Sequence, residues 1–286
     1  MSVPPAYSDI GKASNDLLFK DFPTGQVKLE VNTVTPTGVK FTVLGHQDNK
    51  NGHVFGELKT KFTDKANGLT LTQGWSATNV LSTKVELANK VASGLKLELN
   101  GSFLPDSGKR NAKVATEYKQ PGLFSRANVD LFKGPTFTGD VSFGLQRNLV
   151  LGSEVSYDVV SGKVTKYAAA AGFIEKDYVF SVHAHSSLSV FTGAYYHRVS
   201  PQVEVGGKVH WDSKVPGGPV GIDVGTKYKL DADASIKARI DNFGKLSLAY
   251  AQLLRPGVKL NLAGTFDTGK LQENAHKVGL SLVFEN

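Results

Sequence analysis

The chain has 286 residues, no cysteine and 33 Lys and Arg against 26 Asp and Glu, which gives a formal net charge of +7. Without cysteine it forms neither disulfides nor thiolate metal sites, and no apolar run approaches the roughly 18 residues of a membrane-spanning helix. The first residues lack a positive stretch followed by an apolar one, so we do not expect export across a bacterial inner membrane.

Residues 1–25 are predicted to form an N-terminal segment with one short amphipathic helix. One side of this helix, at 3.6-residue spacing, carries Tyr7, Ile10, Ser14, Leu17 and Leu18. The other side carries Asp9, Lys12, Asn15, Asp16 and Lys20. A helix of about fourteen residues would be about 21 Å long, and its charged side excludes a path through lipid.

Residues 26–286 are predicted to form an all-β transmembrane barrel, because segments of about ten residues alternate apolar with polar side chains. In residues 94–103, for example, Leu95, Leu97 and Leu99 share one face, and Lys96 and Glu98 lie on the other. Turn-forming residues separate about nineteen such segments, with the count accurate to about one. They are 26–35, 38–46, 53–63, 68–76, 80–89, 94–103, 110–119, 122–132, 136–145, 149–158, 163–173, 177–186, 189–198, 202–210, 218–228, 231–239, 243–252, 256–265 and 275–284. An odd count would make the first and last strands parallel.

A barrel of this size encloses a pore wide enough for metabolites. The helix could lie on the membrane surface or against the inner wall, and its nearly balanced charges favour the lumen. Several basic residues share the polar face of the strands: Lys28, Lys59, Lys61, Lys96, Lys237, Arg239 and Lys259. We therefore predict a pore that prefers anions, with Lys12, Asp16, Lys20, Lys61 and Lys96 as pore-lining residues that set selectivity.

The sequence resembles the mitochondrial outer-membrane porin family, the voltage-dependent anion channels, over its whole length and in a fungal-type form. Its most specific match is the family signature formed by Tyr228, Asp231, Ala232, Ala234, Ala238, Arg239, Ile240, Asp241, Asn242, Ser247, Leu248 and Tyr250. The N-terminal segment is similar to the family's pore helix, and Gly94-Leu95-Lys96 matches a family triplet linked to nucleotide binding. Residues 277–284 resemble the signal read by the mitochondrial barrel-assembly machinery.

The resemblance implies a 19-stranded barrel, integral to the mitochondrial outer membrane and surrounded by membrane lipids. It implies a voltage-gated, weakly anion-selective channel for ATP, ADP, phosphate and small ions, with the assembly machinery as partner. It implies neither a cofactor nor a nucleic-acid partner, and it leaves a homo-oligomer open. If the helix packs beside the sixth strand, Lys12, Lys20 and Lys96 together are the candidates for nucleotide contact.

Three departures from the family pattern bear on function. Asn15 replaces an arginine usual in animal relatives, and residues 21–25 replace a more glycine-rich hinge. Gln73 stands at a membrane-facing position where animal relatives carry a glutamate linked to hexokinase docking. A neutral amide is less costly in lipid than a carboxylate, so that docking role does not transfer readily.

No catalytic or metal site is expected. Residues 264–271 approach a phosphate-binding loop, but Leu271 stands where Ser or Thr should bind magnesium, and we interpret the segment as a turn. His183 and His185 share one strand face and are predicted to be wet, pore-facing side chains, since two ligands make an incomplete metal site. The alternatives to a metabolite channel are a docking platform or lipid-handling barrel with incidental conduction, and a protein-import pore.

Overall fold

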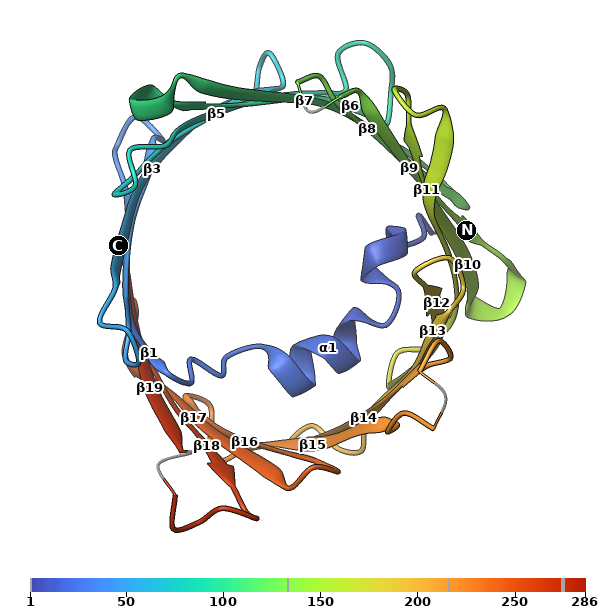
Figure 1. The fold of residues 1–286 in the computed structure, drawn as a ribbon. Helices are drawn as coiled ribbons and strands as arrows, with labels where there is room; N and C mark the ends of the chain where they lie inside the picture. Colours follow the sequence, from blue (N-terminus) through green and yellow to red (C-terminus); the bar gives the residue numbers. More distant parts are fainter. Residues whose placement is uncertain (1, 133, 216, 274–275) are drawn as a thin grey trace.

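The computed structural model describes residues 2–132, 134–215, 217–273 and 276–286. In this part of the chain nineteen strands form one closed sheet around an open lumen (Figure 1). Neighbouring strands are antiparallel, except that β1 and β19 pair in parallel and close the barrel, with Val27 beside Leu280 and Val31 beside Phe284. The fold class, the strand count and the parallel closure predicted from the sequence are confirmed.

The strand boundaries agree with the predicted ones to within three residues, while the predicted start of the last strand at 275 lies outside the described residues. The strands are β1(Gln26–Val34), β2(Lys40–Asp48), β3(Val54–Asp64), β4(Leu69–Ser76), β5(Leu81–Ala88), β6(Leu95–Leu104), β7(Lys109–Gln120), β8(Leu123–Asp130), β9(Thr136–Gly144), β10(Leu149–Asp158), β11(Lys163–Ile174), β12(Tyr178–His185), β13(Val190–Arg198), β14(Val203–Asp212), β15(Gly221–Lys229), β16(Ala234–Asp241), β17(Lys245–Arg255), β18(Val258–Asp267) and β19(Lys277–Glu285). Strand β18 ends at Asp267 and turns follow it, so the phosphate-loop-like segment is a strand end and a turn, as predicted.

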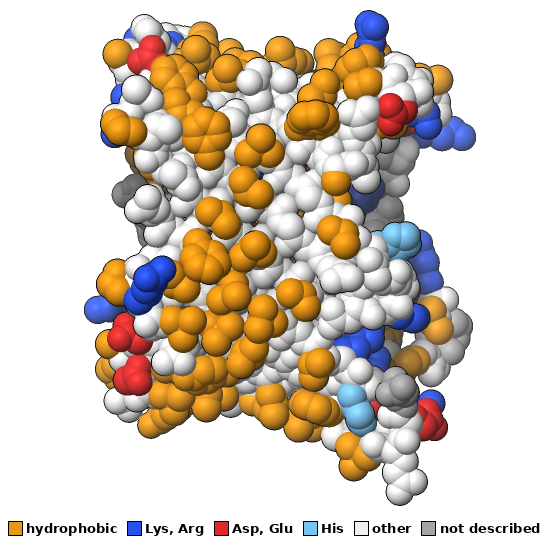
Figure 2. Space-filling view, turned by 90° about the vertical axis from the view of Figure 1, so that its left-hand side faces the viewer, with side chains coloured by type: hydrophobic (Ala, Val, Ile, Leu, Met, Phe, Trp, Pro, Cys, Tyr) orange, Lys and Arg blue, Asp and Glu red, His pale blue; other side chains and the backbone are white. Residues whose placement is uncertain are grey.

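On the side of the barrel shown in Figure 2, many apolar side chains lie on the outer face, and most of the charged ones lie toward its two edges. Val31, Val43 and Leu58 form a cross-strand row over β1, β2 and β3, and the last two are exposed. Gln73 lies on the same outer face, opposite Thr60 of β3, and is exposed. The period of two along each strand therefore sends apolar side chains to the lipid and polar ones to the lumen.

The N-terminal segment lies inside the barrel, as predicted (Figure 1). A single 3-10 turn, η1(Tyr7–Asp9), precedes the helix α1(Lys12–Phe19), which packs against β13, β14 and β15. The helix has 8 residues and is shorter than the fourteen we predicted, because Gly11 takes a left-handed conformation with φ +76° and separates it from the 3-10 turn. In the described part of the chain, no helix is both long and apolar enough to cross a membrane.

Backbone hydrogen bonds attach this segment to both rims of the barrel. The N–H of Gly122, in the turn after β7, donates to the carbonyl of Ser2 at 3.1 Å. The N–H of Gly25, just before β1, donates to the carbonyl of Val278 at 3.1 Å. Because β1 and β7 both begin at the same rim, the turn after β7 lies at the opposite one. The segment therefore runs from one end of the pore to the other.

Candidate functional site

The functional site is the N-terminal segment together with the wall on which it lies. Its apolar anchors, Ile10, Leu17 and Leu18, are at most 4% exposed. All five residues predicted on the apolar side of the helix are buried: Tyr7, Ile10, Ser14, Leu17 and Leu18. Because the pore is otherwise polar, burying each anchor contributes about 1.5–3 kcal/mol to holding the segment on the wall.

Glycines on the inner face of the wall make room for these anchors, and we call Gly152, Gly172, Gly206 and Gly225 the glycine sockets. A Cβ atom at Gly152 or Gly172 would come within 2.8 Å of the Ile10 side chain. A Cβ at Gly206 would lie 2.8 Å from Leu17 Cδ2, and one at Gly225 would lie 2.7 Å from Leu18 Cδ2. Any larger residue in a socket would therefore push the segment away from the wall.

Polar contacts hold the first half of the segment. Nε2 of His183 donates to the carbonyl oxygen of Ile10 at 2.8 Å, and the Ser14 hydroxyl donates to the carbonyl of Gly207 at 3.3 Å. The Tyr7 hydroxyl lies 3.2 Å from Nδ1 of His185. Burial, with help from the charges of Glu154 and Asp140, raises the pKa of Tyr7 to about 12, so the phenol stays neutral and able to donate.

Both histidines lie on the lumenal face, as predicted, but the prediction that they are solvated is wrong for His183, while His185 is half-buried. His183 is only 9% exposed, and its ring stacks on that of His185 with centroids 5.2 Å apart. The strand pattern placed both rings on the lumenal face correctly, but it could not show that the N-terminal segment covers that part of the face. Among the described residues no group of three or more metal-binding side chains is found.

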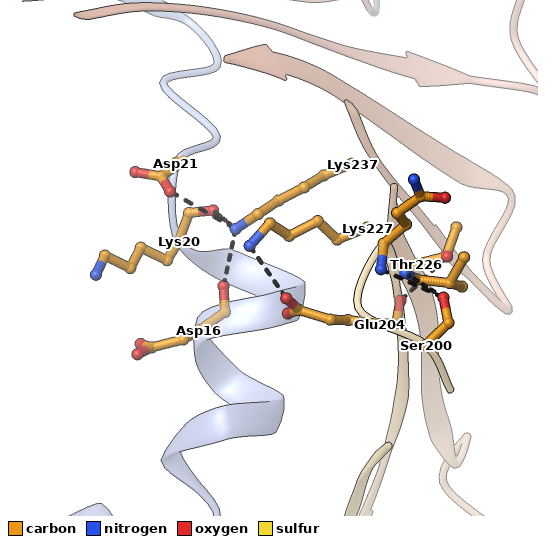
Figure 3. A network of polar contacts seen from close by, with 10 residues as sticks. Asp16, Lys20, Asp21, Ser200, Glu204, Thr226, Lys227 and Lys237 are labelled. Carbon is orange, nitrogen blue, oxygen red and sulfur yellow. Dashed lines mark hydrogen bonds and ion pairs between the residues drawn. The ribbon is translucent and has the colours of Figure 1, made fainter. Parts of the chain in front are cut away.

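Lys237 of β16 holds the C-terminal end of α1 (Figure 3). Its Nζ donates to the carbonyl oxygens of Asp16 at 3.2 Å and Lys20 at 3.1 Å, and lies 3.6 Å from a carboxylate oxygen of Asp21. Carbonyls at a helix C-terminus lack partners within the helix and carry partial negative charge, so a cation is favourable there. Lys237 is 8% exposed, so it acts as a clamp on the helix and not as one more solvated pore charge.

Two further basic residues of the wall lie against the exposed side of the helix. Phe19 receives the guanidinium of Arg239, with 4.8 Å from Cζ to the ring centroid, and the ammonium of Lys208 at 5.2 Å. Nζ of Lys208 also donates to Oδ1 of Asn15 at 3.1 Å. An arginine at position 15 would bring a second cation beside the Lys208 ammonium, so the neutral amide of Asn15 fits this wall.

The other predicted pore-lining residues are spread around the lumen. The Lys12 ammonium lies 3.6 Å from a carboxylate oxygen of Asp9. The side chains of Asp16 and Lys20 point away from Lys237 and the wall (Figure 3). On β3, Lys61 lies directly opposite Lys40 of β2 on the inner face, and we find no carboxylate within 4.0 Å of either lysine in the described residues.

Lys96 belongs to a separate group of four charges on β5 and β6. Its Nζ lies 2.6 Å from carboxylate oxygens of both Glu86 and Glu98. Lys84 also pairs with these two acids, at 2.9 and 3.1 Å. The helix contacts β13, β14 and β15 and not the sixth strand, so the arrangement that would bring Lys96 beside Lys12 and Lys20 is not found (Figure 1).

Sequence reasoning missed the two features that position the helix. Alternation alone assigned Lys237 to the pore wall, and nothing in its spacing pointed to the helix end. The sequence contains a weak indication of the glycine sockets. Glycines interrupt the polar inner face of β10, β11, β14 and β15, all in the second half of the chain, and could have indicated where the helix packs.

A closed membrane barrel with an apolar outer face, a charged inner wall and an open lumen defines a porin-type channel protein. Residues 3–279 match the family described as eukaryotic porin. The chain is 45% identical to the mitochondrial outer membrane protein porin of Candida albicans and 44% identical to that of Neurospora crassa, each over 99% of both chains. It is 39% identical, over 99% of both chains, to a Saccharomyces cerevisiae protein named non-selective voltage-gated ion channel 1.

The chain therefore belongs to the eukaryotic porin family. It is an integral protein of the mitochondrial outer membrane. The family consists of channel proteins, so the expectation that this chain is not an enzyme is confirmed.

The glycine sockets generate a prediction about the position of the helix. Gly225→Val should displace Leu18 and expose the buried face of α1. Because the chain has no cysteine, Ser14→Cys, at a position only 1% exposed, supplies a single reporter. We compare the Ser14→Cys protein with and without Gly225→Val and measure how fast a water-soluble maleimide labels the thiol at position 14. Because loss of one buried leucine contact favours the displaced helix, we expect labelling to be roughly tenfold faster when Gly225→Val is present.

Gly193→Val is the matched control, because a Cβ at this β13 glycine meets nothing within 4 Å. Equal labelling rates in the Gly225 and Gly193 variants would show that the sockets do not hold the helix.

Proposed function

We propose that this protein is a voltage-gated, weakly anion-selective channel for small hydrophilic metabolites such as ATP, ADP and phosphate. The observation that carries the proposal is an open lumen in which Lys20, Lys40 and Lys61 face no carboxylate within 4.0 Å among the described residues, while most other wall charges are paired. The names of the fungal and insect relatives, which include a voltage-dependent anion-selective channel of Drosophila melanogaster at 36% identity, support it. No observation favours a docking platform or a lipid-handling barrel instead.

Weak selectivity follows from the pairing of wall charges. Glu57, Glu86 and Glu98 neutralise neighbouring lysines, so the net charge of the chain overstates the positive field in the pore. An ion in a wide pore keeps its hydration shell and feels only the remaining diffuse field, which salt screens over about 8–10 Å.

Replacing the four predicted selectivity lysines with glutamate should shift the reversal potential towards cation preference. The variant carries Lys12→Glu, Lys20→Glu, Lys61→Glu and Lys96→Glu. We expect the sign of the reversal potential in a KCl gradient to invert, because eight units of charge change inside the lumen. Planar-bilayer recordings of the purified protein provide the measurement.

A control with the same change in net charge uses loop lysines instead. It carries Lys50→Glu, Lys65→Glu, Lys90→Glu and Lys214→Glu. Equal shifts in the two variants would mean that the lumenal lysines do not act on the permeation path.

We propose that voltage gating moves the helix away from its seat on the wall. The contacts that hold it are separate and individually weak, and α1 carries charged groups on its lumenal side. Lys237→Met should remove the clamp at its C-terminal end and destabilise the seated arrangement by about 1–2 kcal/mol. That corresponds to a roughly 5- to 30-fold change in the ratio of seated to displaced helix, so closure should begin at lower voltage.

Lys259→Met serves as the comparison, because Lys259 on β18 also faces the lumen but makes no hydrogen bond or ion pair to another described side chain. If conductance against voltage is the same for both variants, the Lys237 clamp plays no part in closure.

Nucleotide contact is proposed at Lys12 of α1 and at Lys20, which directly follows α1, and Lys96 on β6 is proposed as a separate contact. Each lysine offers a mobile point charge to a polyphosphate, and rapid flux requires weak binding. Titrating ATP while recording amide NMR shifts should therefore give small, salt-sensitive shifts at Lys12 and Lys20. Shifts confined to the outer loops would reject the lumenal site.

The last strand is proposed to carry the signal for the mitochondrial barrel-assembly machinery. Leu280, Leu282 and Phe284 share its outer face, as such a signal needs. Gly279 also has a structural role, because a Cβ there would collide with the carbonyl oxygen of Pro23. A homo-oligomer stays a prediction.

A further inference from the structure

We propose that the outer face of the barrel binds an anionic phospholipid at one built site, a groove across β5, β6 and β7. The groove has a volume of about 480 Å³, within the range of small-molecule sites. Its outward-facing lining is Leu81, Thr83, Gly101, Phe103, Arg110 and Phe132. It combines a place for an acyl chain with a place for a phosphate.

The acyl-chain part of the groove is a gap in the band of large apolar side chains. Thr83 of β5 and Gly101 of β6 are cross-strand neighbours and form its floor. One step towards the rim, Leu81 and Phe103 are also neighbours and form a wall. A Cβ at Gly101 would meet no atom closer than 3.9 Å, so the space above it is open to lipid.

The phosphate part is Arg110, which is the second residue of β7 and lies opposite Phe103. Its guanidinium carbon is 5.6 Å from the centre of the Phe103 ring, which holds the planar group at the edge of the groove. The side chain is exposed, and no described carboxylate lies within 4.0 Å of it. A guanidinium without a partner acid can bind a phosphate through two parallel hydrogen bonds.

Arg110 lies at the depth of the lipid headgroups. It follows the turn Pro105–Ser107 at the rim where β4 also ends. At that rim the indole of Trp75 donates to Oδ1 of Asn79 at 3.2 Å, and Asn79 in turn donates to Asp106 at 2.8 Å. A tryptophan at the barrel rim whose indole N–H is hydrogen-bonded is typical of the membrane interface. At that depth an arginine on the lipid-facing side destabilises the barrel much less than it would at the bilayer centre.

A second outward groove, across β16 to β19, shows what the proposed site adds. It has a similar volume of about 460 Å³ and is lined by Ile236, Leu248, Tyr250, Leu262, Phe266 and Val278 among others. Its described lining includes no charged side chain, so it can take an acyl chain but cannot select a headgroup. Charge complementarity therefore assigns the anionic lipid to the Arg110 groove.

The test uses the full chain in phosphatidylcholine vesicles that contain a small fraction of phosphatidylglycerol with a photoactivatable acyl chain. After illumination, mass spectrometry of peptides should find label at Leu81, Phe103 and Phe132. Arg110→Ala should lower this label by about fivefold, the effect of one basic residue at a membrane surface, and leave the label at Leu262 in the second groove unchanged. Gly101→Leu, which fills the floor but keeps the arginine, should lower it too.

Lys109→Ala is the matched control, because Lys109 lies at the same rim but on the inner face of β7. A phosphatidylcholine probe with the same photoactivatable chain should label both grooves equally, and Arg110→Ala should not change the amount of this label. The proposal is overturned if the neutral probe labels the Arg110 groove as strongly as the anionic one, or if Arg110→Ala and Lys109→Ala give the same label. Cross-links from this groove to a second copy of the chain, in place of lipid label, would also overturn it.

Discussion

The hydrogen-bonding demand of the backbone in lipid is the constraint on which the rest of this structure depends. Hydrocarbon offers no partner to an N–H or C=O group, so each strand must pair on both sides and the sheet must close. With nineteen strands, closure requires the parallel pairing of β1 with β19. Once the sheet is closed, each strand has one face in lipid and one in the lumen, and this division assigns a side to nearly every residue.

The inner wall that results is a pattern of neighbouring charges and not an even positive coat. Cross-strand neighbours lie close enough for acids and bases to pair, as Lys96 does with Glu86 and Glu98. Where two like charges face each other, as Lys40 and Lys61 do, the field stays positive. The lumen therefore holds positive regions separated by neutral ones, which is consistent with weak anion preference.

The helix gives the pore an asymmetric interior. It covers β13 to β15, where glycines leave room for Leu17 and Leu18, and Lys237 closes its C-terminal end. The wall that includes β3 and β6, which carry Lys61 and Lys96, lies away from the helix (Figure 1). The helix rests on a few buried anchors and side-chain hydrogen bonds, while the barrel is held by continuous backbone ladders, so the displacement that we propose for the helix would leave the wall folded.

The sequence by itself determined the elements and their sides. Alternation at 94–103 and in the other segments showed the strands, and the turns between them gave their number. The apolar side of the N-terminal segment, with Ile10, Leu17 and Leu18, could also be predicted, because the 3.6-residue spacing of these side chains involves only nearby residues. Each of these signals depends only on residues close together along the chain, which is why a single sequence contains them.

Only the tertiary structure decided which wall receives the helix and which charges remain free. Lys237 is 216 residues from Asp21, His183 is 173 residues from Ile10, and Gly225 meets Leu18 only because the closed sheet brings β15 beneath α1. Alternation gave Lys61, Lys96 and Lys237 the same lumenal side, yet one faces a like charge, one is neutralised and one is buried. The period of two specifies a face, but it does not say which residues of the neighbouring strands lie beside Lys61 and Lys96, or that the N-terminal segment covers Lys237.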